Sequence, residues 1–468
     1  MKYLKNVKIP QYFSLNVYDI IIVGGGISGL TLASVLGSKL EDFPLRIALI
    51  EKSDLKSLKK WVPFESKYSN RISSLNLSTV LFLEDVGIWK YVKKERVQSY
   101  YGMQVWDGIS SSRIDFCIGN YKENQDESKA LAFMIENANL QSALLKKINE
   151  FSNFIDIFDS TKISCIKYDN CGNDVYDLSD WPVVKLLNGK TMISRLLIGA
   201  DGVHSLVGKF SGIESFGWDY NAHGLVAILK LTDFSSVNEI ITAWQRFLPY
   251  GPIAILPLPN KYATLVWSCP PEMAAFLKSL PKSTFLFLVN AAYRLDIADL
   301  SYILSLKSYL EIESQIKWRL GFYQKNGPVP PFAVDLQNDT RESFQLRTRH
   351  LKSYIKERIA LLGDAAHTIH PLSGQGLNMG LGDVRSLSRV IFNALSIGQD
   401  IGTSQVLKQY ESDRYLKNYI MLGVTDKLYK LYSTENPFIV GLRSIGLSGI
   451  NKFDWIKKTL IRKVSLEF

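Results

Sequence analysis

The sequence has few cysteines and no long apolar run. Its four cysteines (Cys117, Cys165, Cys171 and Cys269) include no C-x-x-C pair, so neither a metal site nor a redox dithiol is indicated, and a reducing compartment is the simpler inference. No uninterrupted stretch of about 18 apolar residues is present, so no membrane-spanning helix is expected. The segment VYDIIIVGGGISGLTLASVLG contains Asp19 and three consecutive glycines, and we interpret it as a strand followed by a helix.

The sequence also lacks the marks of disorder and of nucleic-acid binding. Hydrophobic residues make up 46% of the 468 residues and charged residues 21%, which is an ordinary globular composition. The 55 Lys and Arg against 45 Asp and Glu give a net charge of +10, which fits an acidic partner, an anionic membrane face or simply a solvated basic surface. No compact basic cluster interleaved with aromatic residues is present, so we expect no nucleic-acid partner.

The amino terminus, MKYLKNVKIPQYFSLN, contains three lysines and no acidic residue. This composition is compatible with an organelle-targeting leader, which we predict for residues 1–16. A basic terminus without a targeting function is the alternative, because the arginines that are typical of such leaders are missing.

A strand–turn–helix–strand pattern follows. The apolar strand YDIIIV precedes GGGISG, the helix-like GLTLASVLGSKL and a second strand, LRIALIE. This order predicts the opening βαβ unit of a dinucleotide-binding fold. Gly24 permits the tight turn, Gly26 lets the backbone approach a pyrophosphate, and Gly29 allows close helix packing. Glu51, at the end of the second strand, can accept both ribose hydroxyls of an adenosine. A glycine-rich turn that binds nothing is the alternative.

Further helices and a second sheet are expected downstream. The stretch SNRISSLNLSTVLFLEDVGIW fits a helix that includes Leu75 and ends at Gly87, and residues 136–151 predict another helix. From Trp218 to Pro270, alternating and apolar strands separated by prolines and asparagine predict a separate mixed or antiparallel sheet. Helical patterns return at about 284–295, 375–397 and 404–433.

Two segments place polar residues at turns. LLIGADGVHSLVGK is an apolar strand that ends at Asp201, and a carboxylate there lies at the sheet edge where α/β folds bind ligands. GDAAHTIHPLSGQGLNMG contains four glycines, Asp364 and two histidines, His367 and His370. We reject a metal interpretation of the histidines because Pro371 breaks the turn and no third ligand is indicated. No metal site is predicted.

Together, YDIIIVGGGISGL, IGADGVHS and GDAAHTIHPLSGQGLN resemble, in order and spacing, the three signatures of the flavin-dependent aromatic hydroxylases. Further segments, including TAWQRFLPYGPIAILPL and NRISSLNLSTVLFLEDVGIW, are similar to the ubiquinone-biosynthesis monooxygenases, and matching regions extend over most of residues 17–430. Within that branch the sequence most resembles the mitochondrial enzymes that hydroxylate the 5-position of a polyprenyl-hydroxybenzoate ring.

The resemblance implies an α/β fold with a Rossmann-like FAD-binding domain, a substrate domain built on a second, mixed or antiparallel sheet, and a C-terminal helical extension. We expect the FAD-binding domain to comprise residues 17–90, 130–215 and 340–433, the substrate domain residues 91–129 and 216–339, and a basic C-terminal helical region residues 434–468. That last region either lies on an anionic membrane surface or packs on the flavin domain with its lysines in water.

The resemblance also implies that FAD is the cofactor. The first βαβ unit would hold its adenosine. Arg71, which is otherwise a surface charge, matches a position that contacts the cofactor, and Asp364 matches an acid that hydrogen-bonds the ribityl chain. Asp201, in the second signature, belongs to the same expected cofactor-binding set.

The third signature is implied to lie beside the flavin ring. The backbone amides around Gly374, Gln375 and Gly376 would cap a helix N-terminus next to the pyrimidine ring, and Asn378 completes the matched motif. A helix N-terminus there stabilises the negative charge of reduced flavin and favours its reaction with oxygen.

The implied reaction transfers one oxygen atom of O₂, through a flavin hydroperoxide, to a lipid-tailed phenolic substrate. Water has to be excluded during this transfer, so we expect the second sheet to roof the flavin with apolar side chains. No catalytic base is identified. Tyr220, His223 and Arg246 are polar residues of the expected roof, and structural roles are the better interpretation of all three.

One departure from the family concerns the electron donor. An arginine usually follows Ser205 by three or four residues, whereas Lys209 stands here, and no second G-x-G-x-x-G is present to bind NADPH. Mitochondrial relatives receive electrons from a ferredoxin and its reductase, and a net charge of +10 suits an acidic ferredoxin. We therefore expect this donor, with NADPH as the alternative.

The same resemblance implies where the protein works and with what. We expect a peripheral protein on the matrix side of the mitochondrial inner membrane, in a membrane-associated complex with other ubiquinone-biosynthesis proteins. Rival functions are a flavin halogenase, a prenyl reductase and a non-catalytic prenyl-binding chaperone. A halogenase would have a W-x-W motif, which none of the nine tryptophans forms, and a reductase would lack TAWQRFLP. A chaperone would lack the GDAAH and GQG elements, so their presence favours catalysis.

Overall fold

The structure is a computed structural model that describes residues 16–117, 127–168, 178–232, 240–324, 327–453, 455–457 and 459. The expected leader at residues 1–16 lies outside this part of the chain except for Asn16. Within the described ranges, no helix is both long and apolar enough to cross a bilayer.

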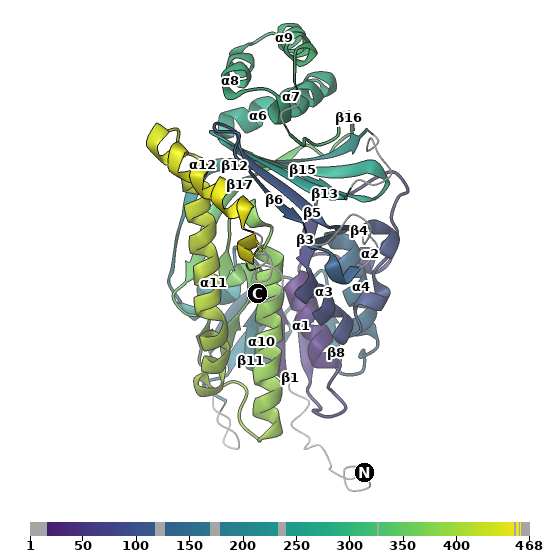
Figure 1. Ribbon diagram of the computed structural model, residues 1–468. Coiled ribbons are helices and arrows are strands. Elements are labelled where there is room, and N and C mark those ends of the chain that lie inside the picture. Colours follow the sequence, from purple (N-terminus) through teal and green to yellow (C-terminus); the bar gives the residue numbers. More distant parts are fainter. Residues whose placement is uncertain are drawn as a thin grey trace.

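An eight-stranded sheet forms the lower part of the molecule in Figure 1. Its main path is β18 (Ile355–Lys356), β19 (Ile359–Leu361), β11 (Thr191–Gly199), β1 (Val17–Val23), β2 (Ile47–Ile50) and β8 (Ile155–Phe158), with β10 (Pro182–Leu186) on β11 and β9 (Ile163–Tyr168) on β10. From β19 to β8 the neighbouring strands are parallel. Strands β1 and β2 are almost uniformly apolar and buried, as parallel strands with both faces covered require.

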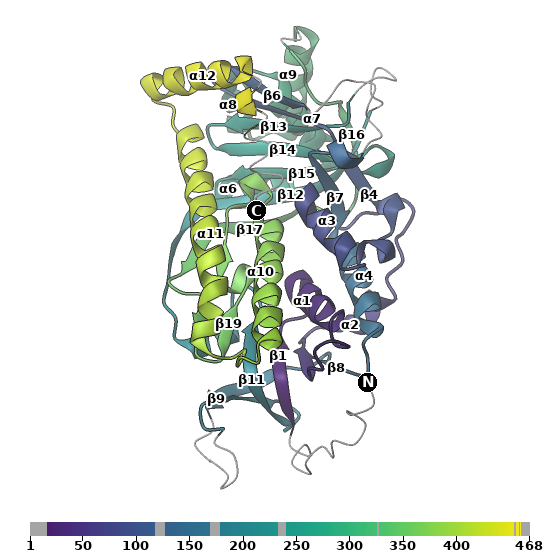
Figure 2. The same cartoon turned by 60° about the horizontal axis from the view of Figure 1, so that its bottom comes forward.

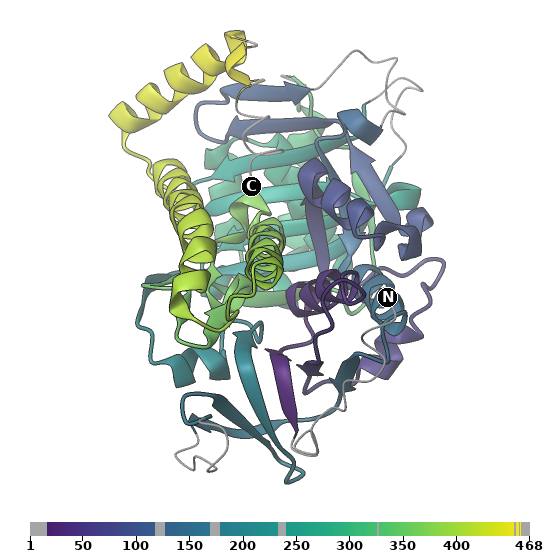
Figure 3. The same cartoon turned by 90° about the horizontal axis from the view of Figure 1, so that it is seen from below.

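Helices surround this sheet. α1 (Ile27–Gly37) contacts both α4 (Asn137–Asn149) and α10 (Gly376–Ser396). α10 also lies beside α11 (Ser404–Tyr432), and α10 is seen nearly end-on in Figure 3. Short helices α2 (Leu55–Lys59) and α5 (Leu206–Ser211) follow β2 and β11. The helices expected at 136–151, 375–397 and 404–433 are therefore present.

A nine-stranded sheet forms the second layer. Its path is β20 (His367–Thr368), β17 (Glu342–Leu351), β12 (Ser215–Leu231), β15 (Tyr262–Cys269), β14 (Gly251–Pro257), β13 (Thr242–Leu248), β5 (Gly102–Asp107) and β6 (Arg113–Cys117), with β16 (Ala333–Leu336) on β12. It is mixed because β13 and β5 run parallel. Its outer face carries α6 (Pro271–Ser279), α7 (Lys282–Arg294), α8 (Ile297–Ser305) and α9 (Tyr309–Gly321), at the top of Figure 1.

A small antiparallel sheet lies between the two large ones and consists of β3 (Ile72–Asn76), β7 (Ala132–Glu136) and β4 (Val97–Tyr100). α3 (Leu77–Asp85) follows β3 directly. The expectation that Leu75 belongs to this helix is wrong, because the side chain of Asn76 accepts a hydrogen bond from Thr79 N and starts the helix after it.

The carboxyl-terminal helix α12 (Pro437–Lys452) leaves α11 and packs on β6 of the second sheet (Figure 2). The expected fold class is confirmed: a Rossmann-like α/β unit, a mixed second sheet and C-terminal helices. The division into domains stays a prediction. β17 and β20 pair into the second sheet, although both lie in the range 340–433 expected for the FAD-binding domain.

Candidate functional site

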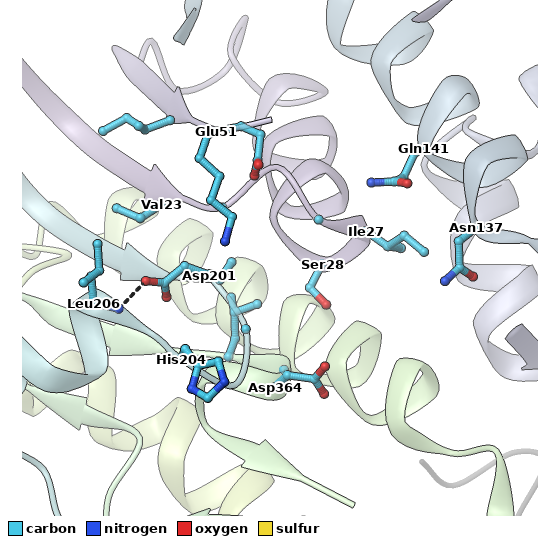
Figure 4. A pocket seen from close by; sticks show the side chains of 18 of the residues that line it. Val23, Ile27, Ser28, Glu51, Asn137, Gln141, Asp201, His204, Leu206 and Asp364 are labelled. Carbon is cyan, nitrogen blue, oxygen red and sulfur yellow. Dashed lines mark hydrogen bonds between the residues drawn. The ribbon is translucent and has the colours of Figure 1, made fainter. Parts of the chain in front are cut away.

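A cavity of about 720 Å³ opens where β1, β2 and β11 end. Its wall includes Val23 at the end of β1, Glu51 after β2, Asp201 after β11 and Asp364 from the third signature, which lie around one space in Figure 4. Ligands of α/β folds bind at the carboxyl edge of the parallel sheet. The structure therefore brings all three signatures to one cavity.

The three glycines of the first turn serve two purposes. Gly24 has φ +111°, and a Cβ there would lie 2.3 Å from the carbonyl oxygen of Ala200; a Cβ on Gly29 would lie 2.0 Å from Gly24 O. Packing within the protein thus requires both. A Cβ on Gly26, the N-cap of α1, would meet no atom within 4 Å. The cavity therefore has open backbone at a helix N-terminus, which suits a phosphate group.

Glu51 braces the same turn. Its Oε2 accepts a hydrogen bond from Gly25 N at 2.5 Å, and its Oε1 accepts one from Ser53 N at 2.8 Å. Each carboxylate oxygen has a further lone pair. The side chain can therefore hold the turn and still receive ribose hydroxyls, and that contact stays a prediction.

Asp201 is largely engaged by its own turn. Its Oδ1 accepts from Ser205 Oγ at 2.5 Å and its Oδ2 from Leu206 N at 2.6 Å, the bond drawn in Figure 4. Burial raises the pKa of this carboxyl, against the lowering effect of these bonds. Asp201 shapes the cavity wall at the start of α5, and its predicted cofactor contact stays untested.

Asp364 faces the cavity without a partner. It lies in the short 3-10 helix η7 (Gly363–Ala365) and accepts no hydrogen bond from any described residue. Its side chain is exposed to the cavity, yet desolvation by the surrounding protein raises the pKa of its carboxyl, against the lowering effect of His367. The carboxyl therefore faces a cavity that protein surrounds and solvent still reaches. A free acceptor in this place fits a chain of hydroxyls.

The amino end of α10 supplies donors and one unpaired acceptor. Gly374 ends the 3-10 helix η8 (Pro371–Ser373) with φ +62°, and Gly376, the first residue of α10, lines the cavity. The first hydrogen bond into α10 runs from Met379 N to Gln375 O, so the preceding amides have no intrahelical acceptor. The buried Oε1 of Gln375 has no partner in the described structure. Such an edge fits a flat ring with both donors and acceptors.

Arg71 and Asn378 differ from each other in surroundings. Arg71 is exposed, lines the cavity and forms no ion pair with a described residue. Asn378 is 1% exposed; its Oδ1 accepts from Asn76 N and Thr79 Oγ1, and its Nδ2 donates to Ser74 O. The Asn378 side chain thus joins α10 to the β3–α3 junction, and its predicted cofactor contact stays untested.

A buried network that the sequence did not indicate holds the third signature in place. Asp383 Oδ2 lies 2.6 Å from His367 Nε2 and accepts from Gly363 N, while its Oδ1 accepts from Arg414 Nε and Asn418 Nδ2. Burial alone would raise the pKa of Asp383, but His367 and Arg414 hold it well below its usual range. The network joins α10 to α11. No short sequence motif predicts this contact, because its residues come from two different helices.

His370 has different partners. Its Nδ1 accepts from Leu372 N at 3.1 Å, and its ring packs on Tyr220 and Tyr429. Burial lowers its pKa to about 4. The two histidines of the signature therefore serve separate structural contacts, and no group of three potential ligands lies together among the described residues. The absence of a metal stays a prediction.

Arg246, a polar residue of the expected roof, has a structural position. It lies buried on the outer side of the second sheet and donates to the carbonyls of Ala292 and Leu295.

Two cavity residues are not predicted from the sequence. Asn137 and Gln141 line the cavity from α4 (Figure 4). Their i, i+4 spacing at a helix start was a signal that could have indicated them.

Known proteins are similar to this chain in sequence over nearly its whole length. The FAD binding domain family matches residues 17–275 and 329–418. The mitochondrial ubiquinone biosynthesis monooxygenase COQ6 of Schizosaccharomyces pombe is 38% identical over 460 residues, which cover 96% of this chain and 92% of that protein. The COQ6 proteins of Saccharomyces cerevisiae and Homo sapiens are 38% and 34% identical, each over 95% of this chain and 92% of their own lengths.

Solved structures share the fold at lower identity. PqsL of P. aeruginosa in complex with 2-aminobenzoylacetate has a TM-score of 0.63 at 20% identity, over 91% of this chain and 99% of PqsL. The p-nitrophenol 4-monooxygenase PnpA of Pseudomonas putida has a TM-score of 0.67 at 15% identity, over 96% of this chain and 99% of PnpA.

Sequence family and geometry agree on the cofactor. Open backbone at Gly26, a free acceptor at Asp364 and an unpaired acceptor at Gln375 are what the phosphates, ribityl chain and ring of FAD require. The halogenase, prenyl-reductase and chaperone alternatives are set aside by the full-length relatives. This chain is an FAD-dependent enzyme that belongs to the COQ6 family of ubiquinone biosynthesis monooxygenases.

Proposed function

We propose that the enzyme hydroxylates the ring of a polyprenyl-hydroxybenzoate or polyprenyl-phenol at the 5-position, using O₂, during ubiquinone biosynthesis. The observation that carries the proposal is the 38% identity to yeast COQ6 over 96% of the chain, which includes both the cavity and the second sheet. Reduced FAD supplies the activation of O₂. The chain binds and orients cofactor and substrate and keeps water away from them.

The cofactor roles that we propose follow the wall of the cavity. Open backbone at Gly26 takes the pyrophosphate, and Asp364 takes the ribityl hydroxyls. The amino end of α10 lies at the ring and stabilises its negative charge when reduced. The proposed set of cofactor-binding residues is Gly24, Gly26, Gly29, Glu51, Arg71, Asp201, Asp364, Gly374, Gln375, Gly376 and Asn378. The eight-stranded sheet is the proposed FAD-binding unit and the nine-stranded sheet the proposed substrate unit.

The test uses the full chain loaded with FAD, a short-chain prenyl-hydroxybenzoate and a chemical electron supply. Mass spectrometry should detect a product heavier by one oxygen atom, and labelled O₂ should be its source. Nuclear magnetic resonance of the product assigns the ring position. A flavin-loaded enzyme that consumes oxygen and never forms a hydroxylated ring would contradict the proposal. In cells without the protein, normal ubiquinone would contradict the assignment to this pathway.

We further propose a ferredoxin and its reductase as electron donors. The chain carries a net charge of +10, and Lys209, where relatives of the wider family usually have an arginine, is exposed on α5. Anaerobic mixing with reduced ferredoxin should bleach the flavin absorbance within a turnover. If NADPH alone bleached it at a catalytic rate while ferredoxin did not, the donor would be NADPH.

The enzyme is mitochondrial, because its COQ6 relatives are named as mitochondrial proteins. We propose that it lies peripherally on the matrix side of the inner membrane, with other ubiquinone-biosynthesis proteins. α12 supports this because it has two faces. Val440, Arg443 and Leu447 are buried, whereas Phe438 and Ile445 are 74% and 72% exposed. Large apolar side chains on an exposed helix near lysines suit an anionic membrane surface.

The membrane proposal is tested with the variant Phe438→Ser/Ile445→Ser. Removal of the whole helix would be a poor test, because Arg443 is buried against Asp107. The variant should keep its flavin and its thermal midpoint and should sediment several-fold less with phosphatidylcholine vesicles that contain cardiolipin. A control, Phe322→Ser on the far side of the second sheet, should sediment as the parent does. Equal sedimentation of both variants would contradict a role for α12.

A further inference from the structure

The inner face of the nine-stranded sheet, which looks away from α6–α9, is covered at two places. At one, Ile228 and Ala243 pack against Tyr100 and Met134 of the small sheet. At the other, Phe247 packs with Tyr432 of α11 in a cluster that also includes Val105, Leu447 and Leu372. Each cover is a continuous hydrophobic contact, so substrate cannot lie under either of them.

One row of residues lies between these two covers. Gln245 of β13 pairs directly with Val105 of β5 and Ala254 of β14; Ala254 pairs with Val266 of β15, and Val266 pairs with Val226 of β12. Directly paired residues share one face of a sheet. Ala254, Val266 and Val226 are only partly buried, although their strands lie in the middle of the sheet and not at its edges. The inner face is therefore open along this row.

Gln245 is the only polar side chain among these five residues; beyond them, Val226 pairs with Glu342 of β17, which is exposed. Gln245 is 6% exposed, and its amide forms no hydrogen bond with any described residue. A side-chain amide has two donors and an acceptor oxygen, and leaving such groups unpaired in a buried place is costly. The amide atoms of Gln245 are not sealed inside the protein but border space that solvent can reach. An unpaired amide thus faces an apolar, open row.

The row is linked to the cofactor cavity on both sides. Leu372 of η8 belongs to the same hydrophobic cluster as Val105, and two residues later the chain reaches Gly374 at the amino end of α10. On the other side, Tyr100 OH lies 3.3 Å from Ser74 Oγ, and a Cβ on Gly374 would lie 3.7 Å from Ser74 Cβ. Both walls of the row therefore meet at the α10 terminus.

We propose that the side-chain amide of Gln245 hydrogen-bonds an oxygen substituent of the aromatic head group, a hydroxyl or a carboxyl, and so determines which ring carbon is hydroxylated. The inference rests on the proposed function. The apolar side chains of Ala254, Val266 and Val226 contact the ring and the first isoprene unit. A single polar anchor in an apolar surface is typical of sites that orient a small ring.

The experiment compares three probes on the flavin-loaded full chain: a short-chain prenyl-hydroxybenzoate, its analogue without the ring hydroxyl and its analogue without the carboxyl. Binding is followed by the change in flavin absorbance. The parent enzyme should bind one analogue about tenfold more weakly than the complete probe, which identifies the anchored oxygen. The variant Gln245→Met keeps the length of the side chain and should bind that analogue and the complete probe equally.

Turnover gives a readout that a structural role would not change. Gln245→Met should form less hydroxylated product per O₂ consumed and more hydrogen peroxide, or should hydroxylate more than one ring position. The matched control is Gln104→Met, which lies on β5 next to Val105 and therefore on the outer face. The control should keep the parent's probe preference and coupling.

The outcomes separate the two proposals. If the parent enzyme binds all three probes equally, or if Gln245→Met keeps the parent's preference and coupling, the role of Gln245 is wrong while hydroxylation by the parent still supports the function. If the parent hydroxylates no prenylated phenol, the function itself is wrong. Should Gln245→Met fail to load FAD, equal binding of the three probes by the parent would still overturn the role of Gln245.

Discussion

The cofactor cavity and the inner face of the second sheet are built in different ways. The cavity uses short segments in which backbone conformation matters most: Gly24 at φ +111°, open backbone at Gly26 and free amides at the start of α10. The inner face uses single side chains from β5, β13, β14, β15 and β12, aligned by pairing register. Backbone donors suit a diphosphate, whereas apolar side chains with one polar anchor suit a prenylated phenol.

The largest effect is expected where packing within the protein forbids a side chain. Gly24→Val would place a Cβ 2.3 Å from Ala200 O at a positive φ, and it should destabilise the protein by roughly 5 kcal/mol. Thermal unfolding and flavin content measure this loss.

Gly26→Ala is the matched comparison for Gly24→Val. Its Cβ meets no atom within 4 Å, so the apo-protein should unfold within about 1 kcal/mol of the parent. Its FAD affinity should nevertheless fall about tenfold or more, because the methyl group occupies space that the phosphates need. Equal losses of stability in both variants would remove the distinction between the two glycines.

The next effect tests whether α12 belongs to the second sheet. Arg443 forms a bidentate ion pair with Asp107 of β5, with N–O distances of 3.0 and 2.9 Å, and also donates to two carbonyls. Arg443→Met leaves a buried carboxylate unpaired and should cost about 3–5 kcal/mol. The flavin should remain bound while coupled turnover falls. Denaturant unfolding gives the stability.

A more exposed ion pair provides the control for Arg443. Arg319 lies 2.8 Å from Asp299, and their side chains are 14% and 44% exposed, so Arg319→Met leaves a carboxylate that water reaches and should cost only about 1 kcal/mol. The double variant Arg443→Met/Asp107→Leu should be more stable than Arg443→Met alone, because no charge is then left buried. If Arg443→Met were as mild as the control, α12 would not be held by this ion pair.

His370 lies where the two regions meet and makes their junction sensitive to acid. Burial lowers its pKa from 6.5 to about 4. Between these pH values the unfolded chain binds a proton that the folded protein does not, so the free energy of unfolding decreases as the pH falls. The contribution is about 3 kcal/mol.

The variant His370→Asn isolates this contribution. An asparagine can still accept from Leu372 N but does not titrate, so the pH slope of stability between pH 6.5 and 4.5 should become shallower than in the parent. Urea unfolding at several pH values measures the slope, and identical slopes in parent and His370→Asn would contradict the buried neutral histidine.

The smallest effect sharpens the role of Asn378. Asn378→Ala removes hydrogen bonds to Asn76, Thr79 and Ser74 and should cost about 2 kcal/mol of stability. The proposed cofactor contact of Asn378 is its backbone amide at the start of α10, which Asn378→Ala keeps, so FAD affinity should change by less than about threefold, far less than in Gly26→Ala. A large loss of FAD affinity at unchanged stability would instead place this side chain on the cofactor.

Several parts of the site could be predicted because they depend on local geometry. The glycines, Glu51 and the helix at Gly376 all follow from turn and helix-terminus chemistry within one short segment. The network around Asp383 could not be predicted, since its partner Arg414 stands 31 residues away and a single aspartate in a helix carries no signal. Apolar spacing predicts a helix that includes Leu75, because such spacing does not show that Asn76 caps the helix after it.

The sequence by itself therefore determined the family, the cofactor and the position of each turn that lines the cavity, because backbone conformation and motif order are properties of contiguous residues. The tertiary structure alone decided that Asn378 and His367 face the protein, that Arg443 joins α12 to β5, and that Gln245 stands in an open row. Those contacts depend on strand register and on helix–helix packing between segments far apart in the chain, so no short stretch of sequence predicts them.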